Sequence, residues 1–262
     1  MLRLIYRFCE SDIVQDVIFY TKSRRIDFKT YVDWKQHQLL MKTEFEIDVN
    51  ASEATYDIQF GSLKRPTHKN TSWDGAKFEV CGHKWADVSE GGYGVSILND
   101  CKYGHDIHDG KMTLSLIKSG ILPNPTTDQE EHFFTYALLP HIGDYNAAYV
   151  QKEAYCLNVP AVALRMEQDG NGTFDAASLF TLSADNVIAE TVKPAEDGSG
   201  IIVRMYEDHN ARTAVTLTWH TEMKRIVECD LMENEIGEAA EQIADYTFTI
   251  KPFEIKTFKI CE

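Results

Sequence analysis

Residues able to hydrogen-bond a polyhydroxylated ligand gather within residues 85–104. Hydroxyl, amide and carboxylate side chains alternate there with glycines, which allow a ligand or another strand to approach the backbone closely. Val95, Ile97 and Leu98 form a short apolar run that predicts a buried strand between two polar flanks. A strand held between two tight polar turns explains the same composition, so that alternative stays open. The candidate contact residues form one glycine-rich turn: Ser89, Glu90, Gly91, Gly92, Tyr93 and Gly94.

Other chemistries find little support in the residue spacing. Retaining glycoside hydrolysis needs two carboxyl groups about 5 Å apart, but with 41 acidic residues some pair will always be near, so counting indicates nothing. No G-x-S-x-G motif occurs, no cysteine lies in an activating motif, and no Lys-Ser/Thr follows the glycines as a phosphate loop requires. We therefore predict no catalytic residue in this chain.

One histidine pair has a spacing that metal sites use. His105 and His108 form an H-x-x-H, but no third ligand lies nearby in the sequence. The pattern is more typical of two solvated histidines on a polar turn. We predict no metal and no cofactor in this chain.

A second candidate contact is Trp73, at the end of a turn-rich loop over residues 65–73. An indole can stack on the apolar face of a sugar ring. The alternative is a loop packed by its own tryptophan. The other tryptophans, Trp34, Trp85 and Trp219, are expected in the core.

Composition excludes several classes of partner. The chain has 262 residues and a net charge of −15, which argues against nucleic acid and against an anionic membrane surface. No run approaches the roughly 18 apolar residues of a transmembrane helix, and the N-terminus is too short and too rich in arginine for a signal peptide. Six cysteines without a C-x-x-C pair predict free, mostly buried thiols, a reducing compartment and a cytoplasmic location.

The hydrophobic pattern predicts an all-β chain. Alternation over residues 26–34 and 41–49 indicates two long strands with one buried face each, expected to pair with each other. Residues 145–157 are the one helix candidate. The polar segment 168–173 predicts a linker, and regularly spaced short strands after it indicate a small β-sandwich. We thus expect a large sandwich over residues 1–168 and a smaller one over residues 174–262.

Long stretches of the chain resemble the β domains of glycoside hydrolase family 38, the α-mannosidases, in their bacterial and vacuolar branch. The resemblance rests on WADVSEGGYGVSILNDCKYG, QDVIFYTKSRRIDFKTYVDW, SGILPNPTTDQEEHFFTYALLPHIGDY, VRMYEDHNARTAVTLTW and the terminal IKPFEIKTFKI. RPTHKNTSWD also fits, although Lys64 before it departs from the family text. The resemblance implies a large super-sandwich of the galactose-mutarotase type followed by a smaller one.

The same resemblance implies what the chain does. It would be the C-terminal, non-catalytic portion of an α-mannosidase, inactive alone because the nucleophile and the zinc site belong to the catalytic domain. That domain and a mannoside substrate would be its partners, and the glycine-rich turn would reach the sugar pocket. The chain would begin partway into the family's β domain, leaving an exposed sheet edge and favouring a homo-oligomer. A free-standing carbohydrate-binding module and a purely structural oligomerisation domain remain as alternatives.

Overall fold

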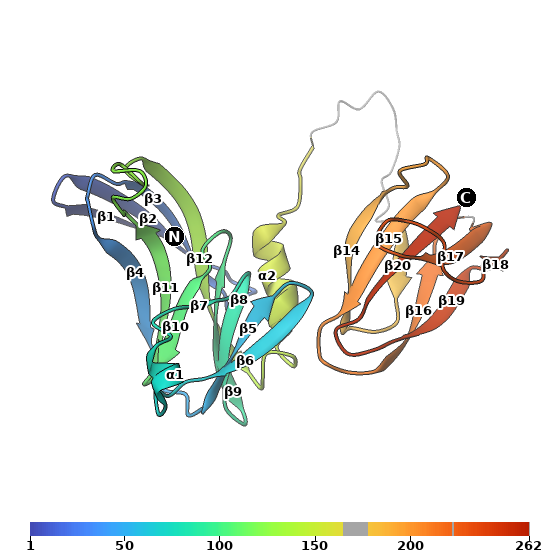
Figure 1. The fold of residues 1–262 in the computed structure, drawn as a ribbon, viewed down its shortest axis with the longest axis horizontal. Helices are drawn as coiled ribbons and strands as arrows, with labels where there is room; N and C mark the ends of the chain where they lie inside the picture. Colours follow the sequence, from blue (N-terminus) through green and yellow to red (C-terminus); the bar gives the residue numbers. More distant parts are fainter. Residues whose placement is uncertain (165–177, 222, 262) are drawn as a thin grey trace. The chain divides into compact units, whose positions relative to one another are not determined.

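The structure, a computed structural model, describes residues 1–164, 178–221 and 223–261. The chain divides into two compact units, Met1–Ala163 and Leu164–Glu262, each with its own hydrophobic core. Figure 1 colours the first unit from blue to yellow and the second from orange to red. The predicted linker, residues 168–173, lies outside the described residues, so the predicted boundaries at 168 and 174 stay predictions.

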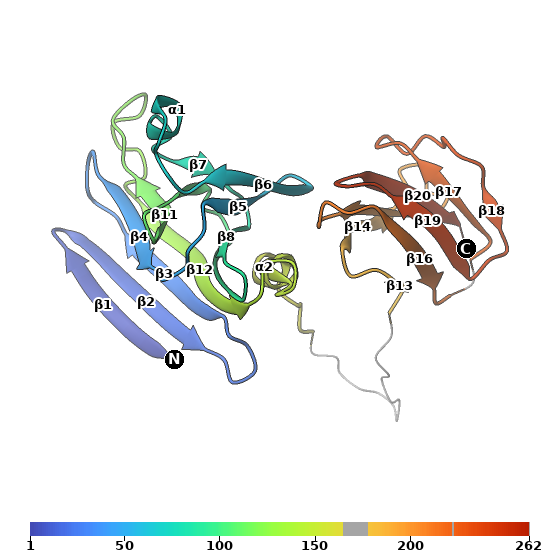
Figure 2. The same ribbon diagram turned by 90° about the horizontal axis from the view of Figure 1, so that it is seen from below.

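Two antiparallel sheets build the first unit, as Figures 1 and 2 show. The larger has strand order β1-β2-β3-β12-β9-β8-β5-β6, and the smaller has order β4-β11-β10-β7. The strands are β1 (Leu2–Phe8), β2 (Ser11–Phe19), β3 (Ile26–Asp33), β4 (Leu40–Glu46), β5 (Glu53–Ile58), β6 (Gly61–Pro66), β7 (Val80–Cys81), β8 (Trp85–Ser89), β9 (Tyr93–Asn99), β10 (Gly104–His108), β11 (Lys111–Lys118) and β12 (Glu131–Ile142).

The larger sheet buries both faces along its central strands. One face of β8 and β9, including Ala86 and Ile97, packs toward the smaller sheet and its fully buried Met112 and Leu114. The opposite face carries Trp85 and meets the helix α2 (Val150–Asn158). Because successive side chains on a strand alternate between faces, a strand covered on both sides is apolar nearly throughout. This explains the nearly continuous apolar run in β9.

The expected pairing of residues 26–34 with 41–49 is wrong. Both segments form strands, but β3 bonds to β2 and β12, while β4 bonds to β11 in the other sheet. Alternation reveals that one face is buried, and it does not reveal which strand lies alongside. The connection between the two crosses from one sheet to the other, and the Gln38 N–H donates to the Ser119 carbonyl at 2.7 Å.

The second unit is a smaller β-sandwich. A three-stranded sheet, β13-β16-β19, and a five-stranded sheet, β14-β15-β20-β17-β18, share one core in which Phe258 and Ile226 are fully buried. The strands are β13 (Phe180–Leu182), β14 (Val187–Pro194), β15 (Ile201–Glu207), β16 (Thr213–Trp219), β17 (Arg225–Cys229), β18 (Ala240–Glu241), β19 (Asp245–Ile250) and β20 (Ile255–Cys261). The prediction of an all-β chain with a second small sandwich is confirmed.

Two expectations about polar side chains fail. All six cysteines are free, but Cys9, Cys81, Cys101 and Cys156 are exposed and Cys229 alone is fully buried. His105 and His108 lie on the strand β10 rather than on a turn, so their side chains alternate and His105 is fully buried. Composition alone did not reveal which strand face each side chain takes.

The first unit contains two helices among its described residues, the short α1 (Ser72–Gly75) and α2. The predicted helix over residues 145–157 is therefore present, with a later start at Val150. No helix in the described part of the chain is long and apolar enough to cross a membrane.

Candidate functional site

The glycine-rich turn (residues 89–94) joins β8 to β9. The Glu90 N–H donates to the Tyr93 carbonyl at 2.8 Å and closes the turn. Its tip, from Glu90 to Tyr93, is exposed, whereas Ser89 is half-buried and Gly94 is buried. The turn therefore presents a solvent-facing tip on a base that is fixed in the sheet.

The space that a side chain on Gly94 would need is occupied by two neighbouring side chains. In the strand register, Ser89 on β8, Gly94 on β9 and His141 on β12 form one row across the sheet. A Cβ on Gly94 would lie 2.3 Å from Cε1 of His141 and 2.4 Å from Oγ of Ser89. Such contacts are impossible without movement, so this glycine serves close approach rather than an unusual dihedral angle.

Behind the turn, the Asp87 side chain takes part in three hydrogen bonds. Its Oδ1 accepts from Oγ of Ser89 at 2.5 Å, and its Oδ2 accepts from Oγ of Ser96 at 2.7 Å and from Nε2 of His141 at 2.7 Å. Asp87, Ser96 and His141 are 1%, 0% and 4% exposed. We call these four residues the Asp87 network. It satisfies a buried carboxylate that would be costly to leave unpaired.

His141 makes a second hydrogen bond through its other ring nitrogen. Its Nδ1 lies 3.1 Å from the Gly143 carbonyl oxygen, while its Nε2 faces Asp87. Each ring nitrogen therefore lies within hydrogen-bond distance of an oxygen, which fixes the orientation of the ring. The network is a hydrogen-bonded polar cluster buried beneath the turn.

The same residues do not form a nucleophilic triad. Oγ of Ser96 lies 3.3 Å from Nε2 of His141, but this nitrogen already donates to Asp87. Ser96 is also fully buried, so no substrate reaches it. A nucleophile needs an accessible oxygen and a base with a free lone pair. The network positions the turn and does not attack a substrate.

One short stretch, residues 47–52, is hydrogen-bonded to several loops. We call it the anchor segment. The Asn50 N–H donates to Oε2 of Glu90 at 2.8 Å. The Thr67 N–H and hydroxyl donate to the carbonyls of Ser52 and Ala51 at 3.0 and 2.7 Å. Ile47 bonds to the β10–β11 hairpin at Gly110. The glycine-rich turn and the start of the loop over residues 65–73 are thus fixed to the same backbone.

Trp73 lies in α1 and is 81% exposed. Thr71 caps this short helix, and its hydroxyl oxygen accepts from the Asp74 N–H at 3.1 Å. Trp34, Trp85 and Trp219 are instead 3%, 2% and 3% exposed, as expected of core tryptophans. No contact in the described part of the chain joins Trp73 to the glycine-rich turn, so the structure places both on the anchored loops without bringing them together.

The turn offers a limited set of groups to a ligand. Ser89 already donates its hydroxyl hydrogen to Asp87, so toward a ligand it can act only as an acceptor. Glu90 uses one carboxylate oxygen on Asn50 and keeps the other. Tyr93 is 39% exposed, and its hydroxyl can donate or accept. These groups suit hydrogen bonding to hydroxyls.

Sequence reasoning missed Asp87, Ser96 and His141. Asp87 and Ser89 are two apart on a strand, which places them on one face and was a usable signal. His141 is 54 residues away from Asp87, and only the pairing of β9 with β12 brings it close.

Metal and thiol chemistry fit the described residues poorly. No group of three His, Cys, Asp or Glu side chains within residues 1–164, 178–221 and 223–261 is arranged to hold a metal ion. His105 and His108 alternate along β10, so they cannot converge on one ion. Desolvation and the neighbouring Asp100 raise the pKa of the Cys101 thiol to about 11, the opposite of an activated nucleophile.

The comparisons with known proteins agree with this architecture. The model described as glycosyl hydrolases family 38 C-terminal domain matches residues 1–126, and the family 38 C-terminal beta sandwich domain matches residues 186–258. The chain is 40% identical over 250 residues to alpha-mannosidase G of Dictyostelium discoideum and 38% identical over 250 residues to alpha-mannosidase 2C1 of Homo sapiens. Each alignment covers 94% of this chain.

A solved structure shows the same fold. The crystal structure of an alpha-mannosidase from Enterococcus faecalis V583 superposes on 95% of this chain with a TM-score of 0.79 at 17% identity, and the chain covers 29% of it. The fold defines a protein of two consecutive β-sandwiches of the kind found in such enzymes. The chain belongs to glycosyl hydrolase family 38, within its C-terminal domains. It spans about a quarter of the length of the curated relatives that it matches.

Proposed function

We propose that the chain is the non-catalytic C-terminal β portion of a cytoplasmic α-mannosidase, which hydrolyses α-mannosidic bonds in carbohydrate metabolism. One observation carries the proposal: both units match C-terminal models of family 38, and the relatives named alpha-mannosidases are about four times as long as this chain. In this arrangement the chain packs on the catalytic domain, and the mannoside binds between them.

The glycine-rich turn is the part of the chain that reaches the sugar. Its exposed tip and its buried Asp87 network support this role, because a contact that must be held in one geometry needs a fixed base. Glu90 and Tyr93 bond sugar hydroxyls, and Trp73 provides an aromatic face. The nucleophile and the zinc, or a similar divalent metal, belong to the catalytic domain.

Turnover by the isolated chain tests the assignment. We expect no hydrolysis of an aryl α-mannoside by residues 1–262 alone, with or without added zinc. Zinc-dependent turnover by this chain would contradict the proposal. Heat-denatured protein and a preparation treated with chelator serve as controls for contaminating enzyme.

Two variants of the full-length enzyme test the turn. Tyr93→Phe and Glu90→Gln remove one hydrogen-bonding group each, and loss of such a bond to a substrate costs roughly 0.5–1.5 kcal/mol, or about twofold to tenfold in kcat/KM. Val192→Ala, at an exposed position of the second unit, is the matched control. Unchanged kinetics in both turn variants would remove the site assignment.

Self-association is a second expectation, supported by the edge strand β1. This strand lies at one end of the larger sheet, and its Ile5 is 74% exposed. An edge strand exposes unpaired backbone N–H and C=O groups, which can pair with a strand of another chain. We propose a homo-oligomer through this edge, and Ile5→Lys should shift light scattering toward the monomer. A clean monomer of the unaltered chain at high concentration would count against it.

A further inference from the structure

The two sheets of the first unit differ in width at one end. The larger sheet continues beyond β3 through β2 and β1, whereas the smaller sheet ends at β4. The Phe45 ring of β4 lies 5.5 Å from the Phe28 ring of β3, centroid to centroid, so β4 lies over β3. Figure 2 shows β1 as the outermost strand on this side, beyond β4. Within the described residues, no strand of the smaller sheet lies across from β1.

The side of β1 that points in the direction of the core is apolar and exposed. Tyr6 pairs with Ile13, which pairs with Val32, so these three side chains form one row on the core-facing side of the sheet. Exposure rises along this row from 0% at Val32, through a half-buried Ile13, to 50% at Tyr6. An apolar surface of this kind is typical of a place where another segment packs. We call this side of the strand the β1 face, and it consists of Leu2, Leu4, Tyr6 and Phe8.

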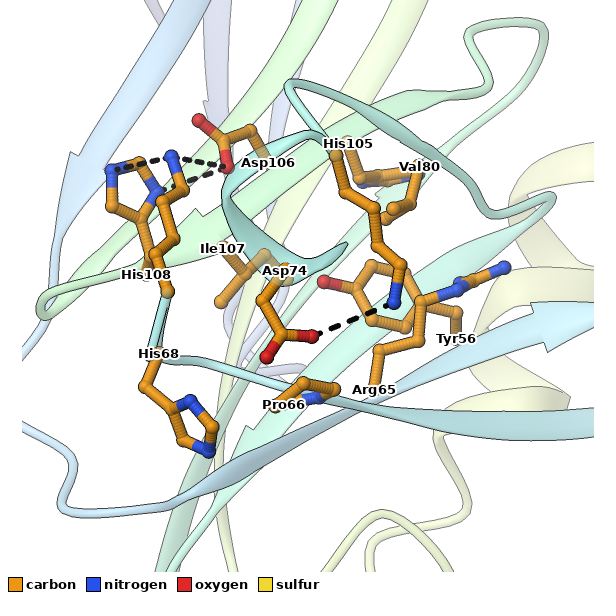
Figure 3. Close-up of a pocket in the computed structure, with 12 residues that line it drawn as sticks. Tyr56, Arg65, Pro66, His68, Asp74, Val80, His105, Asp106, Ile107 and His108 are labelled. Atoms are coloured by element: carbon orange, nitrogen blue, oxygen red, sulfur yellow. Dashed lines mark hydrogen bonds and ion pairs between the residues drawn. The ribbon is translucent and has the colours of Figure 1, made fainter. Parts of the chain in front are cut away.

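At the opposite end of the smaller sheet, the chain's own side chains cover the larger sheet (Figure 3). Tyr56 of β5 is 1% exposed there, because the His105 ring packs edge-on against its ring at 6.0 Å and the Arg65 guanidinium lies over it at 4.6 Å. Burial also lowers the pKa of His105 to about 4. These side chains leave only a small cavity of about 30 Å³. The aromatic residue at this end is thus covered, whereas the β1 face stays exposed.

The edge of β4 beside the β1 face has free backbone groups. β4 pairs with β11 and with no other strand among the residues that the structure describes. The Ile47 N–H donates to the Gly110 carbonyl at 2.8 Å, next to the pairing of Glu46 with Lys111. Because the backbone groups of successive residues point alternately toward and away from the partner strand, those of alternate residues from Glu46 back to Lys42 point away from β11. This edge is therefore open to the addition of a strand.

The charges on the solvent-facing side of β4 favour a basic partner. Lys42 is paired with Glu79 at 2.6 Å, whereas Glu44 and Glu46 share Lys111 at 2.7 and 3.6 Å. The Glu46 side chain is 80% exposed. Carboxylates therefore outnumber the cations beside this edge, and opposite charges directly across a strand pair stabilise the pairing.

We propose that a β-strand from the polypeptide of the α-mannosidase outside these 262 residues pairs with the free edge of β4 and packs its apolar side chains toward the β1 face. Its residues alternate between apolar side chains directed at β2 and β1 and polar ones directed at solvent, with Lys or Arg beside Glu44 and Glu46. Neighbouring strands lie about 4.8 Å apart, so a strand next to β4 lies over β2 and reaches β1 with its larger side chains.

The length of the relatives supports this choice of partner. They are about four times as long as this chain, so such an enzyme has further polypeptide from which to supply a strand. The inference rests on the proposed function, because it assigns the strand to the same enzyme. It uses the side-chain face of β1, and not the backbone edge of β1 at which self-association is expected.

Hydrogen exchange resolved by residue tests the proposal by comparing the isolated chain with the full-length enzyme. The amides of Lys42, Glu44 and Glu46 should exchange rapidly in the isolated chain. In the full-length enzyme they should exchange at least about tenfold more slowly, because the added strand then bonds them. The Ile47 amide is the internal reference, since it is already bonded to Gly110, and its exchange should slow by a smaller factor.

Variants of the full-length enzyme separate strand addition from general stabilisation. Glu44→Pro removes an N–H that points away from β11 and should abolish the protection of this edge, whereas Glu44→Gln keeps that N–H and should retain it. Tyr6→Ser removes an apolar contact of the β1 face and should speed exchange at the β4 edge by about tenfold. Phe133→Ser is the matched control, because Phe133 is 72% exposed and lies on the opposite side of the larger sheet.

Equal exchange of the three edge amides in the isolated chain and in the full-length enzyme would overturn the proposal. Protection that appears in the isolated chain as its concentration rises would also overturn it, since the added strand would then come from a second copy. Equal effects of Tyr6→Ser and Phe133→Ser would contradict packing on the β1 face. Should Glu44→Pro fail to fold, Tyr6→Ser still decides.

Failure of this inference is distinguishable from failure of the proposed function. A full-length enzyme that hydrolyses an aryl α-mannoside with an unprotected β4 edge removes only the strand addition. Turnover by the isolated chain removes the proposed function instead.

Discussion

The carboxylate of Asp87 lies 2.7 Å from Nε2 of His141, and both side chains are almost completely buried beneath an exposed turn. The other ring nitrogen of the histidine lies within hydrogen-bond distance of a carbonyl oxygen, and two serine hydroxyls complete the carboxylate's hydrogen bonds. Buried polar clusters of this kind depend on every group having a hydrogen-bond partner, because a buried polar group without one is costly. Every member is therefore sensitive to substitution.

Removing one partner of this pair should destabilise the first unit strongly. His141→Ala leaves the buried Asp87 carboxylate without one of its hydrogen-bond partners, and we expect a loss of about 1–3 kcal/mol in the free energy of unfolding. Urea unfolding followed by tryptophan fluorescence measures it. His37→Ala, at an exposed histidine, is the control and should change stability by less than about 0.5 kcal/mol. A loss no larger than that of His37→Ala would mean that the Asp87–His141 bond adds nothing to stability.

Adding a single methyl group at the base of the turn should also be costly. Gly94→Ala places a Cβ about 2.3 Å from His141, so the network must move, and we expect a loss of about 1–3 kcal/mol. Gly91→Ala is a matched control, because a Cβ there meets nothing within 4 Å. Thermal unfolding of both variants decides the matter. Equal stabilities would show that the row Ser89–Gly94–His141 is not tightly packed in solution.

Acid should weaken the first unit through His105. The pKa of this histidine is lowered from 6.5 to about 4 in the folded chain, so below pH 6.5 the unfolded chain binds a proton that the folded chain does not. Its contribution is full above pH 6.5 and is lost as the pH falls toward 4, by about 2 kcal/mol at pH 5. Urea unfolding at pH 7 and pH 5 measures this, with His105→Asn as reference. A pH slope that is the same in both proteins would contradict the prediction.

The second unit should respond on its own to a cavity in its core. Phe258 is fully buried and lies 4.8 Å from Phe248, centroid to centroid. Phe258→Ala should cost about 3–5 kcal/mol, and Val192→Ala on the surface close to nothing. Hydrogen exchange resolved by residue should show the loss in β14 to β20 and leave β8, β9 and β12 unchanged. Loss of protection in both units together would mean that the two cores unfold as one.

The fold was predictable from the sequence because apolar and polar residues alternate along the long strands, and because stretches from both units resemble family 38. Residues 26–34 and 41–49 read correctly as strands with one buried face. Their partners did not follow, because the same alternating pattern satisfies any neighbouring strand, and the connection after Trp34 carries no signal that it changes sheets.

The candidate site was predictable only in part. The glycines and polar residues mark the position of the turn, and the role of Trp73, which is exposed, stays a prediction. His141 and His105 could not be found in the same way. His141 joins Asp87 through a long-range strand pairing, and the His105 ring is buried against Gly82 and Tyr56, which are distant from it in the sequence.

The anchor segment has a consequence for how such chains can change. Residues 47–52 hold the glycine-rich turn, the start of the loop leading to α1 and the β10–β11 hairpin through their backbone groups. Substitutions of the exposed side chains Asp48, Asn50 and Ser52 leave these bonds in place, since backbone groups make them, but an inserted or deleted residue shifts every donor and acceptor at once. Loop grafting between relatives should therefore transfer these loops together with the anchor segment as one cassette.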